Sequence, residues 1–485
     1  MTIKDLKPAL VWQIFDEITQ VPRPSKKEEK IRQYLLDWAA KNNISAKTDA
    51  IGNVVMNRPA TPGCENAPTI ILQSHMDMVC ESNKPFDFKN NPITTIIDGD
   101  WVTADGTTLG ADNGIGMAAA MAALVSPDVV CGPIEALFTV DEETGLTGAN
   151  NLGEGMLNGD MLLNLDSEDD GQIFIGCAGG VDTVCTFTYT AKEAPADYTY
   201  LKVSVSDGLG GHSGGDIHLG HANANKVLTR FLWEQKQKGT LVLAEIDGGN
   251  LRNAIPRAAH AIIGIENGRK HDFMADFNIY CAQIAGEYEG LETTLKIIIE
   301  SAEKPATVVD CETANAVITS VYSAPHGVVS MSRELENLVE TSTNLASIKM
   351  RNSNEIVVTT SQRSSVESRK WDIANQVEAH FALAGAKVEH GEGYPGWKPN
   401  MNSTIMQIIA SAYEELYNEK PLITAIHAGL ECGLMLEKYP HLDMASFGPT
   451  LRGVHSPSEK MHIPSVARFW DQIVLILKKV SQLKK

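Results

Sequence analysis

Histidines and carboxylates stand directly after several short apolar runs of the sequence, and these residue types bind metals and carry protons. His75 follows the run at 68–73, and Asp77 comes two residues later. Because residues i and i+2 of an extended backbone point the same way, Asp77 can hold one imidazole nitrogen while the other nitrogen binds a metal. By itself the motif also fits an ordinary surface histidine beside a surface aspartate.

Two further apolar runs are followed by carboxylates. Glu142 and Glu143 come after the run at 134–140, and Asp166 comes after the run at 160–165. Adjacent side chains of an extended chain diverge, so one glutamate can bind a metal while the other moves a proton. A solvated acidic turn is the alternative interpretation of either motif alone.

Asp112 is the one charged residue of the stretch TTLGADNGIG, which precedes an alanine-rich run with helical character. An aspartate at such a place can cap a helix. Capping does not explain why Gly110, Gly114 and Gly116 crowd around it. We predict that these glycines leave open space and backbone freedom for a carboxylate that faces two cations at once.

These candidates share a position in the expected fold, because each follows the C-terminal end of a predicted strand, where open α/β sheets build their sites. The predicted metal ligands are His75, Asp112, Glu143, Asp166 and, in a loop rich in glycine and proline, His455. A mixed nitrogen and oxygen set favours zinc, with cobalt or manganese as alternatives, over magnesium or calcium. Two such ions lie ~3.5–4 Å apart and share a nucleophile. The three carboxylates and one hydroxide would balance their charge.

The elements that must position these residues alternate between strand and helix. The apolar runs, bounded by polar residues or glycine, predict strands buried on both faces of a parallel or mixed sheet. Residues 25–43 have helical apolar spacing, with Ser25 as the expected N-cap and Glu28 three residues later. A helix between two buried strands is the pattern of a βαβ unit and predicts the α/β class.

The pattern of the sequence changes twice along the chain. After about residue 186 the sequence predicts alternating strands of an exposed sheet with a few helices, and from about residue 391 the earlier pattern returns. A chain of 485 residues is also too long for one ordinary core. We therefore predict one domain from residues 1–186 and 391–485, interrupted by an inserted domain at 187–390.

The composition argues against several classes of function. Asp and Glu number 61 against 41 Lys and Arg, a net charge of −20, so no nucleic-acid partner is expected. No apolar tract is long enough to cross a membrane, and the first residues show no export signal. The eight cysteines include no CxxC pair, which suits reduced thiols. We expect a cytoplasmic protein without a membrane partner.

The glycine-rich stretch around His212 follows a predicted strand, as a dinucleotide-binding fingerprint would. Its spacing fails, because the third required glycine falls on Ser213. His212 could reach a substrate oxygen from a mobile loop, or it could face water in a glycine-rich hairpin. The residues alone leave both interpretations open.

Motifs spread along the chain resemble those of the aminoacyl-histidine dipeptidases, which cleave Xaa-His dipeptides such as β-alanyl-histidine. In order they are SHMDMV, GTTLGADNGIGMA, DEETG, NLDSED, GGHSGG, LRNAIPR, HAGLECG and GVHSPSE. These enzymes belong to the di-zinc metallopeptidase family that includes peptidase T and carboxypeptidase G. The resemblance runs from about residue 10 to the C-terminus. It implies an exopeptidase-like catalytic domain, with a mostly parallel or mixed sheet between helices, interrupted by an inserted α+β lid and dimerisation domain.

The resemblance implies a role for each predicted metal ligand. Asp112 is similar to the carboxylate that bridges both metals. His75 and Asp166 would complete the site of one metal ion, and Glu143 and His455 would complete the other.

The resemblance also implies roles in catalysis and substrate binding. Glu142 resembles the general base that takes a proton from the bridging water and passes it to the leaving amine. Asp77 resembles the residue that orients His75, and His212 is similar to a lid histidine that stabilises the oxyanion, often across a dimer interface. The implied substrate contacts are Asn253, Arg363 and Gly429, the first two for the C-terminal carboxylate.

Together these roles imply a metal-dependent dipeptidase that hydrolyses small unblocked dipeptides, including Xaa-His dipeptides, by attack of a hydroxide held between two metals. A homodimer is the implied assembly. An amidase or deacylase acting on N-acyl amino acids could use the same two metals. A metal-retaining binding protein without turnover is a third hypothesis, and the presence of Glu142 speaks against it.

Overall fold

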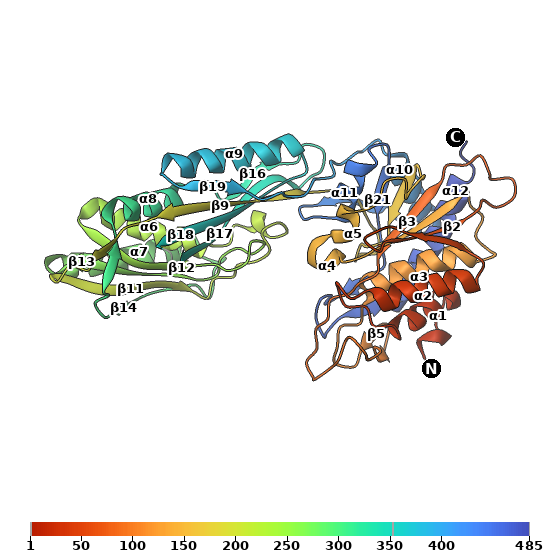
Figure 1. Ribbon diagram of the computed structural model, residues 1–485, viewed down its shortest axis with the longest axis horizontal. Coiled ribbons are helices and arrows are strands. Elements are labelled where there is room, and N and C mark those ends of the chain that lie inside the picture. Colours follow the sequence, from red (N-terminus) through yellow and green to blue (C-terminus); the bar gives the residue numbers. More distant parts are fainter. Residues whose placement is uncertain (1, 352–353, 485) are drawn as a thin grey trace. The chain divides into compact units, whose positions relative to one another are not determined.

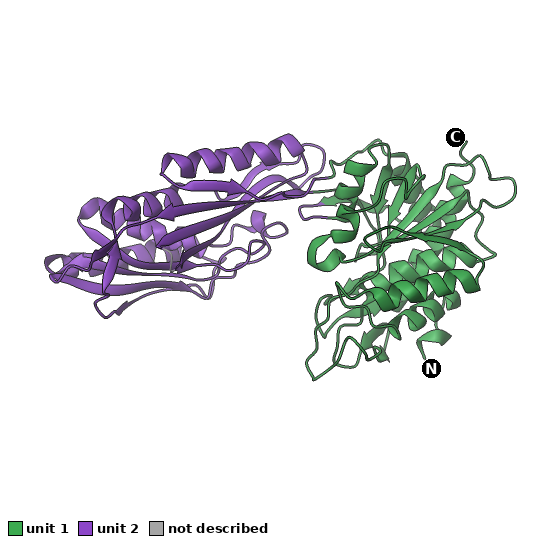
Figure 2. Cartoon of the chain, viewed as in Figure 1, with its two compact units in different colours: residues 1–177, 397–425, 430–485 green, residues 178–396, 426–429 purple. Residues whose placement is uncertain are grey.

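The computed structural model describes residues 2–351 and 354–484, which form two compact units (Figure 2). The first unit contains residues 1–177, 397–425 and 430–485, and the second contains residues 178–396 and 426–429. The boundaries predicted from the sequence, 186/187 and 390/391, differ from those of the structure, which lie at 177/178 and 396/397. The sequence also did not predict that the segment 426–429 joins the second unit. The lid and dimerisation roles of the inserted part stay predictions.

The first unit is built on an eight-stranded mixed sheet. Its strands, in spatial order, are β1 (Ser45–Thr48), β2 (Val54–Arg58), β6 (Ile134–Thr139), β3 (Ile70–His75), β7 (Met161–Asn164), β21 (Asp443–Ser446), β8 (Gln172–Cys177) and β20 (Leu422–Ile426). β3 runs parallel to both β6 and β7, and β21 runs parallel to β7. β3, β6 and β7 are buried along their whole length, as their apolar runs predict.

Helices cover both faces of this sheet (Figure 1). They are α1 (Ala9–Thr19), α2 (Glu29–Lys41), α3 (Ala111–Val125), α4 (Glu142–Gly145), α5 (Thr147–Asn150), α10 (Thr404–Tyr417), α11 (Glu431–Lys438) and α12 (Ile463–Val480). Leu72 of β3 packs among side chains of α3, whereas its neighbour Gln73 donates a hydrogen bond to Glu431 of α11. The alternation of strand side chains thus places α3 and α11 on opposite faces, which confirms the α/β class with a sheet between helices.

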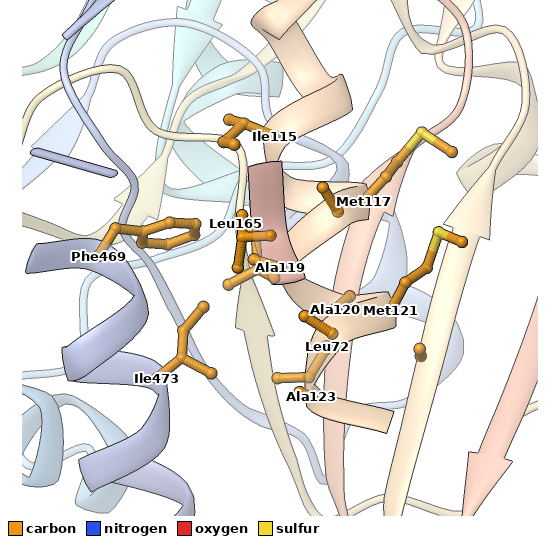
Figure 3. Close-up of a cluster of buried hydrophobic side chains, with 14 of the residues drawn as sticks. Leu72, Ile115, Met117, Ala119, Ala120, Met121, Ala123, Leu165, Phe469 and Ile473 are labelled. Carbon is orange, nitrogen blue, oxygen red and sulfur yellow. The ribbon is translucent and has the colours of Figure 1, made fainter. Parts of the chain in front are cut away.

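The alanine-rich helix α3 lies in the core of the first unit. Its small side chains are fully buried, so neighbouring elements approach its backbone closely. Figure 3 shows Phe469 and Ile473 of α12 on one side of this cluster, with Leu72 and Leu165 beside Ala119 and Ala120. A smaller sheet of β22 (Leu451–Arg452), β23 (Lys460–His462), β5 (Trp101–Ala104) and β4 (Thr95–Asp98) completes the unit.

The second unit is an antiparallel sheet packed on helices. The strand order is β14 (Lys296–Ser301), β11 (Tyr198–Ser206), β13 (Ala259–Glu266), β12 (Leu241–Gly248), β17 (Val339–Arg351), β18 (Glu355–Ser364), β9 (Gly179–Thr188) and β19 (Lys387–His390), and β16 (Gly327–Met331) pairs with β17. β10 (Ala191–Glu193) and β15 (Thr307–Val309) form a separate pair. One core is shared by the sheet and helices α6 (Ala224–Lys238), α7 (Lys270–Glu287), α8 (Cys311–Ser323) and α9 (Glu367–Leu383).

Short 3₁₀ helices lie at η1 (Ile3–Asp5), η2 (Ile217–Leu219) and η3 (Asn267–Arg269). Within the described residues, none of the helices combines the length and the apolar character needed to cross a membrane.

Candidate metal and catalytic centre

The predicted metal ligands of the first unit meet at one edge of its sheet. His75 is the last residue of β3, Asp166 follows β7, and Glu143 lies at the start of α4, directly after β6. Because these three strands are parallel, the residues that follow them emerge at the same edge. Asp112 reaches this edge from the first turn of α3, and His455 reaches it from the loop between β22 and β23.

The five side chains form two groups that share one carboxylate. His75 Nε2 lies 3.0 Å from Asp112 Oδ1 and 3.3 Å from Asp166 Oδ1. His455 Nε2 lies 3.2 Å from Asp112 Oδ2 and 3.0 Å from Glu143 Oε2. In each group the possible ligand atoms lie within 4.8 Å of one another. Each oxygen of Asp112 therefore faces a different group, which is the arrangement that a bridging carboxylate needs.

The electrostatics of the centre suit positive ions. Burial alone would lower the pKa of His75, but Asp166 and Asp112 raise it well above its ordinary value. Hydrogen bonds to Asp112 and Glu143 raise the pKa of His455 to about 11. Among the described residues, the buried Oε1 of Glu143 has no hydrogen-bond partner. Carboxylates thus outnumber the cations beside them, and a nitrogen and oxygen set with an unused oxygen fits a pair of divalent metals.

Asp77 holds both a predicted ligand and the predicted base in place. Its Oδ1 lies 3.3 Å from His75 Nδ1 and accepts a hydrogen bond from Glu142 N at 3.1 Å. Its Oδ2 accepts hydrogen bonds from Glu143 N at 3.3 Å and from Ser25 Oγ at 2.7 Å. The sequence-based assignment of Ser25 as a helix cap is wrong, because α2 begins after Glu28 and the Ser25 hydroxyl serves Asp77 instead.

Glu142 lies beside the first group of ligands. One of its carboxylate oxygens lies within 4.8 Å of ligand atoms of His75 and Glu143. Burial, reinforced by the charges of Asp166 and Glu431, raises the pKa of Glu142 well above its ordinary value. A raised pKa means that the carboxyl group takes up a proton more readily than an ordinary glutamate, which is the property that a general base requires.

The glycines around Asp112 match one half of the prediction: Gly110 has a φ of 68°, a backbone conformation that favours glycine, but the three glycines are not surrounded by open space. A Cβ at Gly110 would lie 2.6 Å from Arg23 Nη2, and a Cβ at Gly114 would lie 2.7 Å from the same atom. A Cβ at Gly116 would collide with Asn113 Oδ1 and lie 2.7 Å from the carbonyl oxygen of Leu165. The prediction that the glycines leave open space for cations is therefore wrong, since a Cβ at each of these positions would lie too close to other protein atoms.

Sequence reasoning missed a network of buried polar side chains next to the centre. Gln73 Nε2 and Thr139 Oγ1 donate hydrogen bonds to Glu431 Oε2 at 2.5 and 2.9 Å, and Asn164 Nδ2 donates to Gln73 Oε1 at 2.5 Å. Gln73 and Asn164 each precede a predicted metal ligand by two residues. A glutamine and an asparagine inside apolar strand runs were the available signal, because buried polar side chains require partners.

His212 lies in the second unit, in a loop that determines which of its nitrogens carries a hydrogen. The backbone N–H groups of Gly214 and Gly215 donate to His212 Nδ1 at 3.3 and 2.9 Å. Burial and the nearby charge of Arg363 lower the pKa of His212. The imidazole is therefore held neutral with its hydrogen on Nε2, as a hydrogen-bond donor.

The predicted substrate contacts also belong to the second unit. Asn253 and Arg363 line one cavity of about 340 Å³, together with Tyr394 and Arg252. Arg363 Nη1 donates to Tyr394 Oη at 2.9 Å, while its buried Nε has no partner among the described residues. Gly429 lies against Tyr394, whose ring a Cβ would approach to 2.8 Å. Asn253 and Arg363 thus line one cavity, and Gly429 lies against Tyr394, which also lines that cavity.

The chain is similar in sequence to known peptidases. The family model described as peptidase family M20/M25/M40 matches residues 71–478. The cytosol non-specific dipeptidase of Escherichia coli (strain K12) is 39% identical over 480 residues, which are 99% of this chain and 99% of the relative.

Solved structures extend the comparison. A crystal structure of aminoacylhistidine dipeptidase from Vibrio alginolyticus is 43% identical, with a TM-score of 0.92, and the match covers 100% of this chain and 99% of that chain. The aminopeptidase PepT from Bacillus cereus ATCC 10987 is 17% identical, with a TM-score of 0.62, covering 98% of this chain and 100% of that chain. At 17% identity the second likeness concerns the fold alone.

Proposed function

The chain belongs to peptidase family M20/M25/M40, and we propose that it is a metal-dependent dipeptidase that hydrolyses small unblocked dipeptides, including those with a C-terminal histidine. The observation that carries the proposal is the sharing of Asp112 between two groups of ligand atoms. The names of its relatives, a non-specific dipeptidase and an aminoacylhistidine dipeptidase, support this substrate class.

The residues of the first unit would hold two divalent ions, with zinc as the proposed metal and cobalt or manganese as alternatives. His75 and Asp166 would bind one ion, Glu143 and His455 the other, and Asp112 both. Such a pair, when bound, polarises a carbonyl group and lowers the pKa of water.

The chain's own residues then have separate tasks around the scissile bond. Asp77 orients His75 through its Nδ1 and also fixes the backbone that carries Glu142. Glu142 takes a proton from the attacking water and passes it to the amine of the leaving amino acid.

The second unit supplies donors for the substrate. The Nε2–H of His212 is suited to stabilise the negative charge that develops on the carbonyl oxygen. Asn253 and the buried guanidinium of Arg363 would bind the C-terminal carboxylate, since arginine recognises carboxylates through paired N–H donors. A homodimer is proposed as the assembly, and a cytoplasmic location is proposed because the Escherichia coli relative is named a cytosol dipeptidase.

The proposal is tested by assaying the purified protein on β-alanyl-histidine, on other dipeptides and on N-acyl amino acids, each with and without a chelator. We expect hydrolysis of dipeptides, loss of activity with the chelator and recovery when zinc is added back. Preference for N-acyl amino acids would instead support the amidase or deacylase alternative. Dipeptide hydrolysis that survives complete metal removal would contradict the proposal.

Replacing His212 with alanine is expected to lower kcat by about 10²-fold, the usual effect of losing one oxyanion donor. The metal content is expected to stay unchanged, because His212 is not among the ligand groups. Steady-state kinetics together with metal analysis would measure both quantities. The control is His271→Ala, which removes an exposed histidine of α7 from the same unit. Loss of metal from His212→Ala would show that this histidine is a ligand.

A further inference from the structure

A single buried carboxylate binds the loop that carries Asp112. Glu459 is 2% exposed. Its Oε2 accepts hydrogen bonds from the backbone N–H groups of Leu109 at 2.7 Å and Gly110 at 3.0 Å, and its Oε1 accepts from Ala111 at 2.8 Å and Asp112 at 3.3 Å. Four consecutive amides thus point at one side chain, which lies about 350 residues further along the chain.

This arrangement replaces an ordinary helix cap. The first amides of a helix have no partner within the helix and usually bond to the side chain of the N-cap residue. The N-cap of α3 is Gly110, which has a φ of 68° and no side chain to offer. The two acceptor oxygens of Glu459 also suit the end of a helix at which backbone N–H groups are exposed.

A buried cation holds the same loop from its carbonyl side. Arg23 donates through Nη2 to the carbonyl oxygen of Gly110 and through Nη1 to those of Asp77 at 2.5 Å and Met76 at 3.2 Å. The loop before Asp112 is therefore held by a carboxylate that accepts from its N–H groups and by a guanidinium that donates to the carbonyl oxygen of Gly110. Arg23 also ties this loop to the segment that follows His75.

The backbone of Glu459 is itself anchored near another predicted ligand. Its N–H donates to the carbonyl oxygen of Ser456 at 3.0 Å, and its carbonyl oxygen accepts a hydrogen bond from Thr103 Oγ1 of β5 at 2.9 Å. Ser456 is the residue after His455. Glu459 therefore connects the loop that carries His455 with the loop that carries Asp112.

We propose that Glu459 is a positioning residue of the metal centre, which holds the backbone of residues 109–112 so that the two oxygens of Asp112 face both ligand groups before any metal binds. The inference rests on the proposed function, because it takes Asp112 to be a metal ligand. Outer partners that orient metal ligands typically contribute about 10–100-fold to metal affinity.

The test compares Glu459→Gln with a matched control. A glutamine at 459 has the same shape but only one acceptor oxygen, and its amide N–H groups would face two of the backbone donors. The control is Glu135→Gln, because Glu135 is also buried in the first unit and accepts the backbone N–H groups of Asn158 and Gly159 at 2.9 and 3.0 Å. Glu135 lies near the start of β6, whereas the metal ligand follows its end.

Metal-free preparations of the native protein and both variants are titrated with Co²⁺ and followed by visible absorption, with thermal unfolding recorded in parallel. For Glu459→Gln we expect affinity for Co²⁺ to fall by about 10–100-fold with a changed spectrum. The control variant is expected to keep native affinity and spectrum, even where both variants unfold at lower temperature. Native affinity and spectrum in Glu459→Gln would overturn the inference and leave Glu459 a role in stability alone.

Two further outcomes are decisive. If the native protein itself binds fewer than two Co²⁺ per chain, the proposed di-metal function fails, and the inference fails with it. If Glu459→Gln does not fold, the inference is tested by amide hydrogen exchange of the native protein instead of by Co²⁺ titration of the variant. We expect the amides of residues 109–112 to exchange slowly with and without metal. Rapid exchange in the metal-free protein would overturn the proposal that the loop is held in advance.

Discussion

Replacing Asp112 with alanine is expected to remove both metal ions together and to lower kcat by at least about 10³-fold. Each oxygen of Asp112 faces one of the two ligand groups, so both groups lose a ligand in the same substitution. Metal ions contribute several kcal/mol of transition-state stabilisation, and about 1.4 kcal/mol corresponds to a tenfold change in rate. Metal content after gel filtration, measured beside kcat on a Xaa-His dipeptide, gives the result.

The control for this variant is Asp105→Ala. Asp105 is an exposed aspartate of the same stretch of chain, and it pairs with Lys84 at 2.6 Å on the surface. Its loss is expected to leave two metals bound. Asp112→Asn adds a further comparison, because an amide keeps the shape of the side chain but offers only one acceptor oxygen. One fully occupied metal in Asp112→Ala would contradict a bridging role.

Replacing Glu142 with alanine is expected to keep both metals and to lower kcat by at least about 10²-fold, the usual contribution of a general base. The side chain is expected to move protons and not to bind metal, because it belongs to neither of the two groups that share Asp112. The measurement is kcat together with metal content.

Glu154→Ala is the matched control for Glu142→Ala, since Glu154 is an exposed glutamate of the same unit. Near-normal turnover in Glu142→Ala would remove Glu142 from the mechanism. Loss of one metal from Glu142→Ala would show instead that Glu142 is a metal ligand. Its carboxylate lies close enough to the ligand atoms of His75 and Glu143 for that role.

The parts of the structure that depend on neighbouring residues in the sequence, such as the buried strands, could be predicted from the sequence. Apolar runs bounded by polar residues predicted β3, β6 and β7, and the polar residues after them predicted where the candidate ligands would gather. The rule that parallel strands end at one edge is general and does not depend on details of packing.

The supporting contacts of the centre could not be predicted, because they join residues far apart in the chain. The hydrogen bonds of Glu459 to the loop before Asp112 span about 350 residues, and those of Glu431 to Gln73 span 358. Ser25 is another example of a contact that a local pattern does not predict. It matched the pattern of a helix cap, but its hydroxyl donates a hydrogen bond to Asp77, 52 residues further along the chain. A pattern of neighbouring residues cannot show which distant carboxylate accepts a hydrogen bond from a given hydroxyl.

The segment 426–429 also gave no local signal of its place in the second unit. Its first residue, Ile426, is the last residue of β20, whose other residues belong to the first unit. Inside the second unit the carbonyl oxygen of His427 occupies the space that a Cβ at Gly214 would need, and His427 Nε2 lies 2.7 Å from Ser342 Oγ. These contacts involve residues that are distant in sequence. The motif HAGLECG therefore gives no sign that its residues up to Gly429 belong to the second unit and those from Leu430 on to the first.

The central claim is that two metal ions share Asp112, and titration of the metal-free protein with zinc tests it most directly. Zinc bound per chain is measured together with the hydrolysis of a Xaa-His dipeptide after each addition. We predict that binding saturates at two zinc ions per chain and that full activity returns only at saturation. Saturation at one ion per chain, with full activity restored, would contradict the account.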